Sequence, residues 1–382
     1  MRIGDEVVIT PSELVAGGAA LARIDGFPIF VANVYPGDVA RIRITEVKKG
    51  FARAELIAIE TPSSLRRAAP CPIADECGGC DWTALRLDAQ LKAKERILRE
   101  SLRRIGKFAS IPEITIHPSP LNYRLRSRLH RDGDAVGFYA MRSNRVVPLA
   151  AECEVVGVET AKRFTSEGRT PSSAQPRGRA AVAAWADEGV RPSEMTVWEI
   201  DGRIITEGEL TIHGYVLGTD AFFQVNRHLL DAMLRLVSNL ARKTSGTAID
   251  LYSGVGFFSV PLAKHFDKVI AVEGSRVSHE YAKRNVPRNV ELVNAAVEEF
   301  RIPKANFVFL DPPRSGAKRS VIDAIAEQTQ DIICFLACDP VTFARDANRL
   351  IACGWRLATL DLLDLFPNTH HVETLASFER AS

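Results

Sequence analysis

The pattern of hydrophobic and polar positions changes along the chain, and it first indicates a small β-rich segment. Residues 1–60 contain short apolar runs separated by glycine-rich turns, at 7–9, 28–31, 39–45 and 52–59. Several short strands with regularly spaced turns predict a small β-barrel, and barrels of the oligonucleotide-binding kind often contact RNA. A structural β cap without a ligand is the alternative for this segment.

From residue 205 onward, strand-like apolar runs alternate with amphipathic segments. Residues 227–242 have apolar side chains at helical spacing, and the predicted strands follow at 247–252, 268–273, 290–294, 306–311, 332–338, 355–361 and 372–378. This alternation predicts a doubly wound, mostly parallel α/β sheet. Ligands of such sheets bind beyond the carboxyl ends of the strands, so we expect the functional side chains there.

The segment between these two, residues 61–204, is mixed. It has strands near 123–130 and 135–149, and residues 165–180 are expected to form a mobile loop because they offer little surface to bury. One basic run alone would usually be a solvated helix face, but two runs beside a cysteine cluster favour a phosphate-facing surface. The runs are Lys92, Lys94, Arg96, Arg99, Arg103, Arg104 and Lys107, then Arg124, Arg126, Arg128 and Arg131.

Length and composition narrow the class of protein. The 382 residues suffice for two or three domains, and 46% hydrophobic with 25% charged residues is typical of globular proteins. No apolar stretch approaches the ~18 to 20 residues of a membrane span, and the opening MRIGDEVVIT has no signal-peptide pattern. We therefore expect a soluble, cytoplasmic monomer. The net charge of +2 does not by itself indicate nucleic acid.

A glycine turn follows the first strand of the α/β segment. The strand ends at Asp250, the turn contains Gly254 and Gly256, and Glu273 ends the next strand. An acidic residue about 20 positions after such a turn can accept hydrogen bonds from ribose hydroxyls, so the pair predicts a nucleoside site. The third glycine of a dinucleotide site is replaced by Phe257–Phe258, which favours adenosylmethionine.

Three later strand ends also carry candidate chemistry. Asp311, stiffened by two following prolines, is placed to orient a flat heterocycle, although an Asp-Pro-Pro alone is often a turn. Cys338 lies between a strand and a helix whose amides would lower its pKa, whereas Cys334 inside the apolar run is expected to be a core residue. Glu373 lies on the last strand, where it would otherwise be an ordinary strand residue.

The order of these motifs resembles the bacterial RNA 5-methyluridine methyltransferases. The matching motifs are AFFQVN (221–226), DLYSGVGFFS (250–259), FLDPPRSG (309–316), ACDPVTFARD (337–346) and DLFPNTHHVET (364–374). The resemblance implies a Rossmann-like class I methyltransferase domain at 205–382, behind a TRAM domain at 1–60. It also implies S-adenosylmethionine as cofactor and RNA as substrate.

The resemblance assigns roles to the candidate residues. Carbon 5 of uracil is a weak nucleophile, so a thiolate first adds to carbon 6, and Cys338 matches that thiolate. Glu373 matches the base that removes the proton from carbon 5. The cofactor would be contacted by the glycine turn at Gly254 and Gly256 and by Gln224, Tyr252, Glu273 and Asp311.

The cysteines form a separate pattern. Seven cysteines without a secretory leader do not suggest a disulfide framework. Cys71, Cys77 and Cys80 have C-x5-C-x2-C spacing, and Cys153 follows later. Four thiolates could bind zinc, but this spacing resembles the four-iron cluster of the family, which implies that residues 61–204 form an iron–sulfur domain.

The substrate is the least determined point. A cluster together with a TRAM domain is most like the enzymes of 23S rRNA, and tRNA is the alternative. Asp339 and Ser253 stand where the family usually has Asn and often Cys, respectively. Two further alternatives are methylation of an exocyclic amine, which needs neither Cys338 nor Glu373, and a catalytically inactive RNA-binding module.

Overall fold

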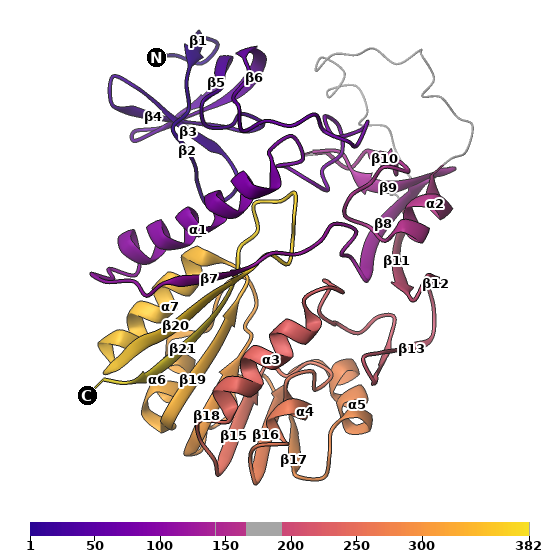
Figure 1. Ribbon diagram of the computed structural model, residues 1–382, viewed down its shortest axis with the longest axis vertical. Helices are drawn as coiled ribbons and strands as arrows, with labels where there is room; N and C mark the ends of the chain where they lie inside the picture. Colours follow the sequence, from indigo (N-terminus) through magenta and orange to yellow (C-terminus); the bar gives the residue numbers. More distant parts are fainter. Residues whose placement is uncertain (142, 166–192, 382) are drawn as a thin grey trace.

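The structure is a computed structural model that describes residues 1–141, 143–165 and 193–381. Three parts are visible in Figure 1: an N-terminal sheet, a second sheet in the middle of the chain, and a large C-terminal sheet with helices. The mobile loop expected at 165–180 falls, apart from Thr165, outside the described residues. No helix in the described ranges is long and apolar enough to cross a membrane.

The N-terminal part is a six-stranded sheet in the order β1-β5-β6-β4-β3-β2. In β5, every second residue is buried, namely Ala40, Ile42 and Ile44, as expected for a strand with one face on a core. The short β2 and the alanine-rich β3 lack a strong apolar pattern and were not predicted. The strands are β1 (Glu6–Ile9), β2 (Glu13–Leu14), β3 (Ala20–Ile24), β4 (Phe27–Val31), β5 (Val39–Val47) and β6 (Ala52–Thr61).

The C-terminal part is an eight-stranded sheet in the order β17-β16-β15-β18-β19-β21-β20-β7. Neighbouring strands are parallel except β21, which is antiparallel to both β19 and β20. The doubly wound sheet is therefore confirmed. Its strands are β15 (Thr247–Leu251), β16 (Lys268–Glu273), β17 (Val290–Asn294), β18 (Ala305–Leu310), β19 (Thr329–Ala337), β20 (Trp355–Leu363) and β21 (Glu373–Arg380).

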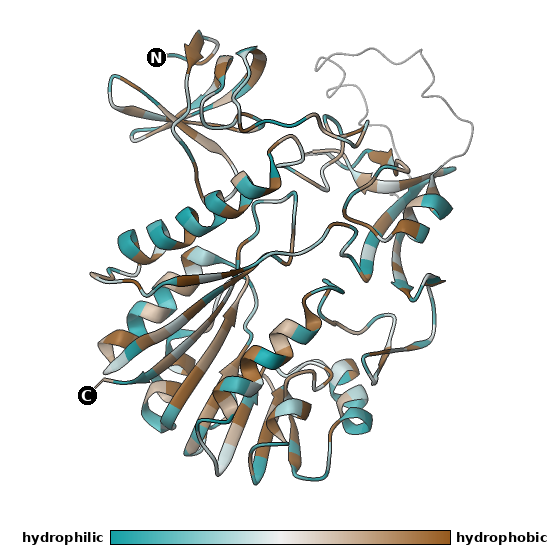
Figure 2. Cartoon of the chain, viewed as in Figure 1, coloured by the Kyte–Doolittle hydropathy of each residue, from teal (hydrophilic) through white to brown (hydrophobic). Residues whose placement is uncertain are grey.

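Helices cover both faces of this sheet, which is why its strands are apolar along most of their length (Figure 2). Phe343 of α7 packs in the same buried cluster as Ile249, whereas Met233 of α3 belongs to the cluster that contains Ala248. Adjacent residues of β15 thus face opposite sides of the sheet, one toward the helix layer of α7 and the other toward that of α3. The helices are α3 (Leu230–Ala241), α4 (Ser259–Leu262), α5 (Arg276–Asn285), α6 (Arg319–Gln328) and α7 (Pro340–Ala352).

The segment predicted as a central domain is divided between two parts of the fold. Its β7 (Ile114–His117) forms the edge of the C-terminal sheet, and α1 (Leu87–Arg104) packs on α7. Five strands form an antiparallel sheet in the order β10-β9-β8-β11-β12, and β13 and β14 pair separately. The remaining elements are β8 (Arg126–Asp132), β9 (Ala135–Tyr139), β10 (Val146–Pro148), α2 (Val158–Phe164), β11 (Ser193–Ile200), β12 (Arg203–Ile205), β13 (Glu209–Ile212) and β14 (Tyr215–Gly218).

The two basic runs do not form one exposed basic surface. Lys94 is wholly buried, and its ammonium lies 2.5 Å from Asp364 Oδ1, so it ties α1 to the C-terminal part. The Arg124 side chain lies between the rings of Tyr123 and Phe138 and near the cysteines rather than facing outward. Others are paired with carboxylates: Arg96 with Glu13, Arg99 with Glu95, Arg103 and Arg104 with Glu100, and Arg128 with Glu194.

Candidate active site

One edge of the C-terminal sheet carries all the candidate residues that follow its strands. Because β15, β16, β18 and β19 are parallel, Tyr252, Glu273, Asp311 and Cys338 lie at the same edge. β21 runs in the opposite direction, so its first residue, Glu373, lies at that edge too. The structure thus brings these five predicted residues to one edge of the sheet.

The glycine turn after β15 has backbone conformations that favour glycine. Gly254 and Gly256 have φ values of +56° and +88°, and a Cβ at Gly256 would lie 2.7 Å from Val286 Cγ1. The Gly254 amide donates a hydrogen bond to Glu273 Oε2 (2.8 Å), and the Ser275 amide donates to Oε1 (2.6 Å). The Glu273 carboxylate is therefore fixed beside the turn, at the place predicted for the nucleoside site.

Asp250 lies beneath this turn, and it was not predicted from the sequence as a site residue. The Ser259 hydroxyl donates to Asp250 Oδ2 (2.5 Å), and burial, opposed by that bond, raises the pKa of Asp250 to about 7. Its Oδ1 and the Ser253 hydroxyl are buried and have no hydrogen-bond partner among the described residues. The only sequence signal was an aspartate at the end of an apolar strand.

Gln224 and Asp311 reach the site from different elements and bind each other. Gln224 Nε2 donates to Asp311 Oδ2 over 3.1 Å, and Gln224 belongs to the loop between β14 and α3. Burial raises the pKa of Asp311 to about 7, and the bond from Gln224 opposes this rise. Asp311 therefore titrates near neutral pH and can either accept or donate a hydrogen bond to a ligand.

Cys338 and Glu373 are neighbours across the antiparallel pair of β19 and β21. Ala337 is paired with Thr374, so the same register, continued by one residue, places Cys338 opposite Glu373. Burial raises the pKa of Glu373 well above its usual range; nearby Asp311 adds to this and Arg314 opposes it. Burial, Glu373 and Asp311 raise the pKa of Cys338 to about 12, again opposed by Arg314.

The expectation that helix amides lower the pKa of Cys338 is therefore wrong for this structure. Asp339 caps the N-terminus of α7, and its Oδ1 accepts hydrogen bonds from the amides of Val341 (3.0 Å) and Thr342 (2.7 Å). These amides are directed at the carboxylate instead of the thiol. The carboxylate at position 339 thus stabilises the helix that follows the nucleophile candidate.

The four clustered cysteines surround one small cavity, although they come from two separate stretches of chain. Cys71, Cys77, Cys80 and Cys153 all line it. Burial raises the pKa of Cys77 to about 11 and that of Cys80 to about 12, and the Arg124 guanidinium opposes both rises. No group of three or more His, Cys, Asp or Glu side chains in the described ranges is arranged to hold a single metal ion.

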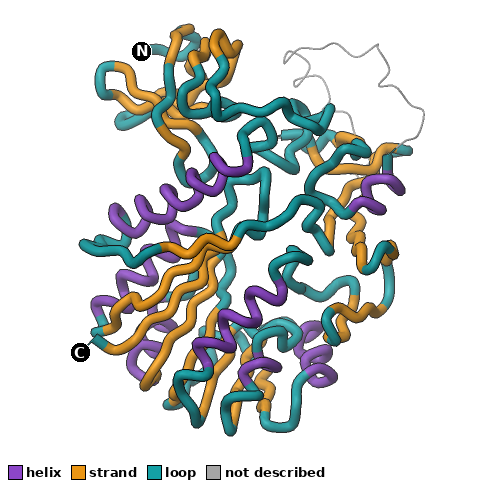
Figure 3. The backbone as a smooth tube through the Cα atoms, in the orientation of Figure 1, coloured by secondary structure: helices purple, strands orange, loops and turns teal. Residues whose placement is uncertain are grey.

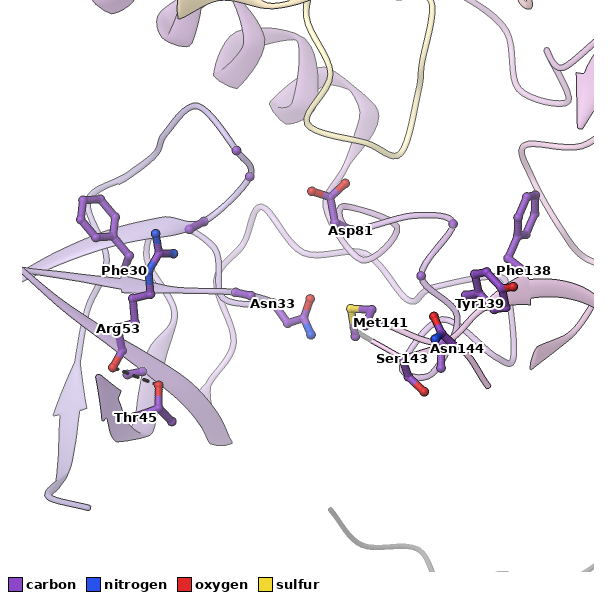
Figure 4. A pocket seen from close by; sticks show the side chains of 18 of the residues that line it. Phe30, Asn33, Thr45, Arg53, Asp81, Phe138, Tyr139, Met141, Ser143 and Asn144 are labelled. Carbon is purple, nitrogen blue, oxygen red and sulfur yellow. Dashed lines mark hydrogen bonds between the residues drawn. The ribbon is translucent and has the colours of Figure 1, made fainter. Parts of the chain in front are cut away.

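A larger cleft of about 840 Å³ lies between the N-terminal sheet and the middle sheet (Figure 4). Asn33 and Arg53 line it from one side, and Tyr139 and Asn144 from the other. The rings of His130 and Tyr139 are stacked with their centroids 3.7 Å apart. The cleft thus offers amides, a guanidinium and aromatic surface to a flat polar ligand.

Two known protein families match this chain. The family described as tRNA (Uracil-5-)-methyltransferase matches residues 206–304 and 302–381, and the TRAM domain matches residues 3–57. An RNA methyltransferase of Gloeobacter violaceus, itself uncharacterized, is 30% identical over 99% of this chain and 97% of its own length. The chain belongs to the RNA (uracil-5-)-methyltransferase family. This methyltransferase is S-adenosylmethionine-dependent.

Other similar proteins agree with this assignment. An uncharacterized RNA methyltransferase of Corynebacterium efficiens is 31% identical over 99% of this chain and 96% of its own length. The solved structure of Pyrococcus abyssi tRNA (uracil-54, C5)-methyltransferase with S-adenosyl-L-homocysteine has a TM-score of 0.71 and 23% identity. The match covers 97% of this chain and 100% of the Pyrococcus abyssi chain. The class I methyltransferase fold and the TRAM domain of the methyltransferase are thus confirmed.

Proposed function

We propose that this methyltransferase acts on a uridine of 23S rRNA through a covalent bond between Cys338 and carbon 6 of the base. The observation that carries the covalent mechanism is the register of β19 and β21, which puts a thiol and a buried carboxyl group side by side at the sheet edge. A nucleophile and a base within reach of one ring are what carbon-5 methylation needs.

The proposed reaction has three steps. The Cys338 thiolate forms a bond with carbon 6, and the electron pair of the C5–C6 double bond moves toward carbon 5 and O4. Carbon 5 then takes the electrophilic methyl group that S-adenosylmethionine supplies, leaving S-adenosylhomocysteine. Glu373 removes the proton from carbon 5, the C5–C6 double bond reforms, and the carbon–sulfur bond breaks to release the thiolate.

The charged groups at this edge of the sheet affect the fraction of Cys338 that is present as the reactive thiolate. Cys338, Asp311 and Glu373 are acidic groups in one buried region, so each disfavours ionisation of the others, and Arg314 favours it. Arg314 Nη2 lies 3.3 Å from His371 Nε2, and burial lowers the pKa of His371 to about 3. A neutral His371 leaves Arg314 as the cation that supports the thiolate.

The cleft of Figure 4 supports an RNA substrate. Its stacked His130–Tyr139 pair suits an unstacked base, and Arg53, which pairs with Glu46 of the same cleft (3.4 Å), has further N–H donors for a base edge. The target uridine would have to leave its stack to reach Cys338, at a cost of a few kcal/mol. We assign the cleft to the single-stranded RNA that flanks the target.

A tRNA substrate is the second candidate. The name of the matching family and the function of the Pyrococcus abyssi protein favour it, while the combination of TRAM domain and cysteine cluster resembles the rRNA enzymes. We expect labelled S-adenosylmethionine to yield 5-methyluridine in unmodified 23S rRNA and little in tRNA. Nucleoside analysis of both RNAs separates the candidates, and label in tRNA alone would replace the rRNA assignment. Label on an exocyclic amine, or none, would contradict the function itself.

We further propose that the four cysteines hold a [4Fe–4S] cluster. Such a cluster is bound by four thiolates, each on its own iron atom. The cysteine sulfur atoms therefore stand farther apart than four sulfur atoms that bind one zinc ion, each about 2.3 Å from the metal. The four thiols line one cavity, as the ligands of such a cluster would. Arg124 Nε is buried beside them without a hydrogen-bond partner among the described residues, which fits an anionic group in the cavity.

Substituting Cys80 by serine should remove most of the iron and sulfide from the protein. The change takes away one thiolate, and the expected starting content is about four iron atoms per chain. Iron, zinc and acid-labile sulfide would be measured after anaerobic purification, with Cys353→Ser as control because Cys353 ends α7 away from the cavity. About one zinc per chain, or iron unaffected by Cys80→Ser, would contradict the assignment.

A further inference from the structure

The loop between β20 and β21 leaves the C-terminal sheet and reaches the segment that follows the N-terminal sheet (Figures 1 and 3). It ends at Glu373, and its central residue Asn368 is wholly buried with φ of +66°. Thr369 Oγ1 donates to the Phe366 carbonyl (2.8 Å), and the buried Lys94 holds Asp364. The loop is thus a compact unit, and a displacement of its centre would be passed on to Glu373.

Every polar group of Asn368 is bonded outside the loop. Its amide donates to Gln90 Oε1 (2.8 Å), and its carbonyl accepts from the Trp82 amide (3.0 Å). Its side-chain Oδ1 accepts from Arg67 Nη2 (2.9 Å), and its Nδ2 donates to Glu154 Oε2 (2.9 Å). Arg67 also pairs with Glu154, so the three side chains form a closed network.

Asn368 and its partner Glu154 belong to the wall of the cysteine cavity. Glu154 directly follows Cys153, and Asn368 itself lines the same cavity as the four cysteines. Asp81 directly follows Cys80, and its carboxylate accepts from the His370 amide (3.0 Å) and contacts His370 Nδ1 (2.5 Å). Two residues of the loop are therefore held by residues adjacent to two of the cysteines.

We propose that Asn368 is a positioning residue that ties Glu373 to the wall of the cysteine cavity. The inference rests on the proposed role of Glu373 and adds what holds that base in place. It also gives the cavity a part in catalysis, because a change in its wall shifts the loop that ends at Glu373. The step affected is removal of the carbon-5 proton, whereas addition of Cys338 depends on β19.

The test is Asn368→Asp, which keeps the shape of the side chain but replaces the Nδ2 donor by an oxygen. The new carboxylate would face Glu154 Oε2 and repel it. We expect turnover on uridine to fall by about 10- to 100-fold, since small misplacements of a base have effects of this size. Substrate KM and bound iron should stay close to wild type.

RNA that contains 5-fluorouridine isolates the affected step. Fluorine on carbon 5 cannot leave as a cation, so the methylated covalent adduct persists whether or not the base is in place. Adduct formation by Asn368→Asp should therefore keep the wild-type rate while turnover on uridine falls. Hydrogen exchange should increase in the peptide that covers residues 364–373.

A second substitution should restore the network. When Asn368→Asp is combined with Glu154→Gln, the new amide at position 154 can donate to the new carboxylate at position 368. Donor and acceptor are thereby exchanged, and Arg67 still pairs with a carboxylate. We expect this double variant to recover most of the turnover. Asn239→Asp is the matched control, because Asn239 is exposed on α3.

Several outcomes would overturn the inference. Equal losses in adduct formation and turnover would show general damage to the fold, and loss of iron in Asn368→Asp would make Asn368 a residue of the cavity alone. Unchanged turnover and exchange would also refute it. Absence of any adduct in the wild-type enzyme would instead contradict the covalent mechanism, and turnover, exchange and rescue would still decide the role of Asn368.

Discussion

Replacing Cys338 by alanine should lower methyl transfer to uridine by at least about 10⁴-fold, because removal of a covalent nucleophile typically has effects of this size or larger. Without the thiolate, carbon 5 does not acquire the electron density that attacks the methyl group. Single-turnover transfer from labelled S-adenosylmethionine measures the loss. The affinity for S-adenosylmethionine should change little. The glycine turn follows β15 and Glu273 ends β16, whereas Cys338 follows β19.

Cys334→Ala is the matched control for this experiment. Cys334 lies on the same strand, β19, but it is wholly buried in the core, as predicted from its place inside the apolar run. Its replacement should lower thermal stability slightly and leave turnover intact. Near-normal transfer by Cys338→Ala would favour methylation of an exocyclic amine, which requires neither a nucleophilic thiol nor Glu373.

The sequence predicted the sheet and the strand ends that carry the candidate residues, because both depend on local patterns. Apolar runs define β15, β16, β18 and β19, and parallel strands necessarily end at one edge. Residues that directly follow a predicted strand, such as Asp311 and Cys338, are therefore placed without knowledge of side-chain contacts. The antiparallel insertion of β21 between β19 and β20 could not be deduced in this way, because it depends on pairing between distant segments.

Features that depend on long-range contacts were not predicted. Lys94 belonged to a basic run that was expected to face phosphate, but it is buried against Asp364, which lies 270 positions later in the chain. β7 joins the C-terminal sheet although the surrounding sequence was assigned to a central domain. The raised pKa of Cys338 also has tertiary causes, namely burial first and then Glu373 of β21 and Asp311 after β18, while the amides of α7 bind Asp339.

Replacing Glu373 by glutamine should trap the enzyme on its RNA. Glutamine has nearly the same shape as glutamate but cannot remove the carbon-5 proton, so the methylated ring stays bonded to Cys338. We expect a complex that survives denaturing electrophoresis and contains the labelled methyl group, while release of 5-methyluridine falls by about 10²- to 10⁴-fold, the usual contribution of a general base.

Electrostatics give this prediction a second part. Glu373 is one of the groups that raise the pKa of Cys338, so the neutral glutamine lowers that pKa and increases the thiolate fraction at a given pH. Because only an ionised Glu373 opposes the thiolate, adduct formation by Glu373→Gln should run ahead of wild type at pH values above the pKa of Glu373 and match it below that pKa, and it should accelerate with rising pH as the thiolate fraction grows. A double variant that also carries Cys338→Ala must form no adduct. An adduct that persists in this double variant would place the covalent bond elsewhere, and rapid release of product by Glu373→Gln would assign proton removal to another group.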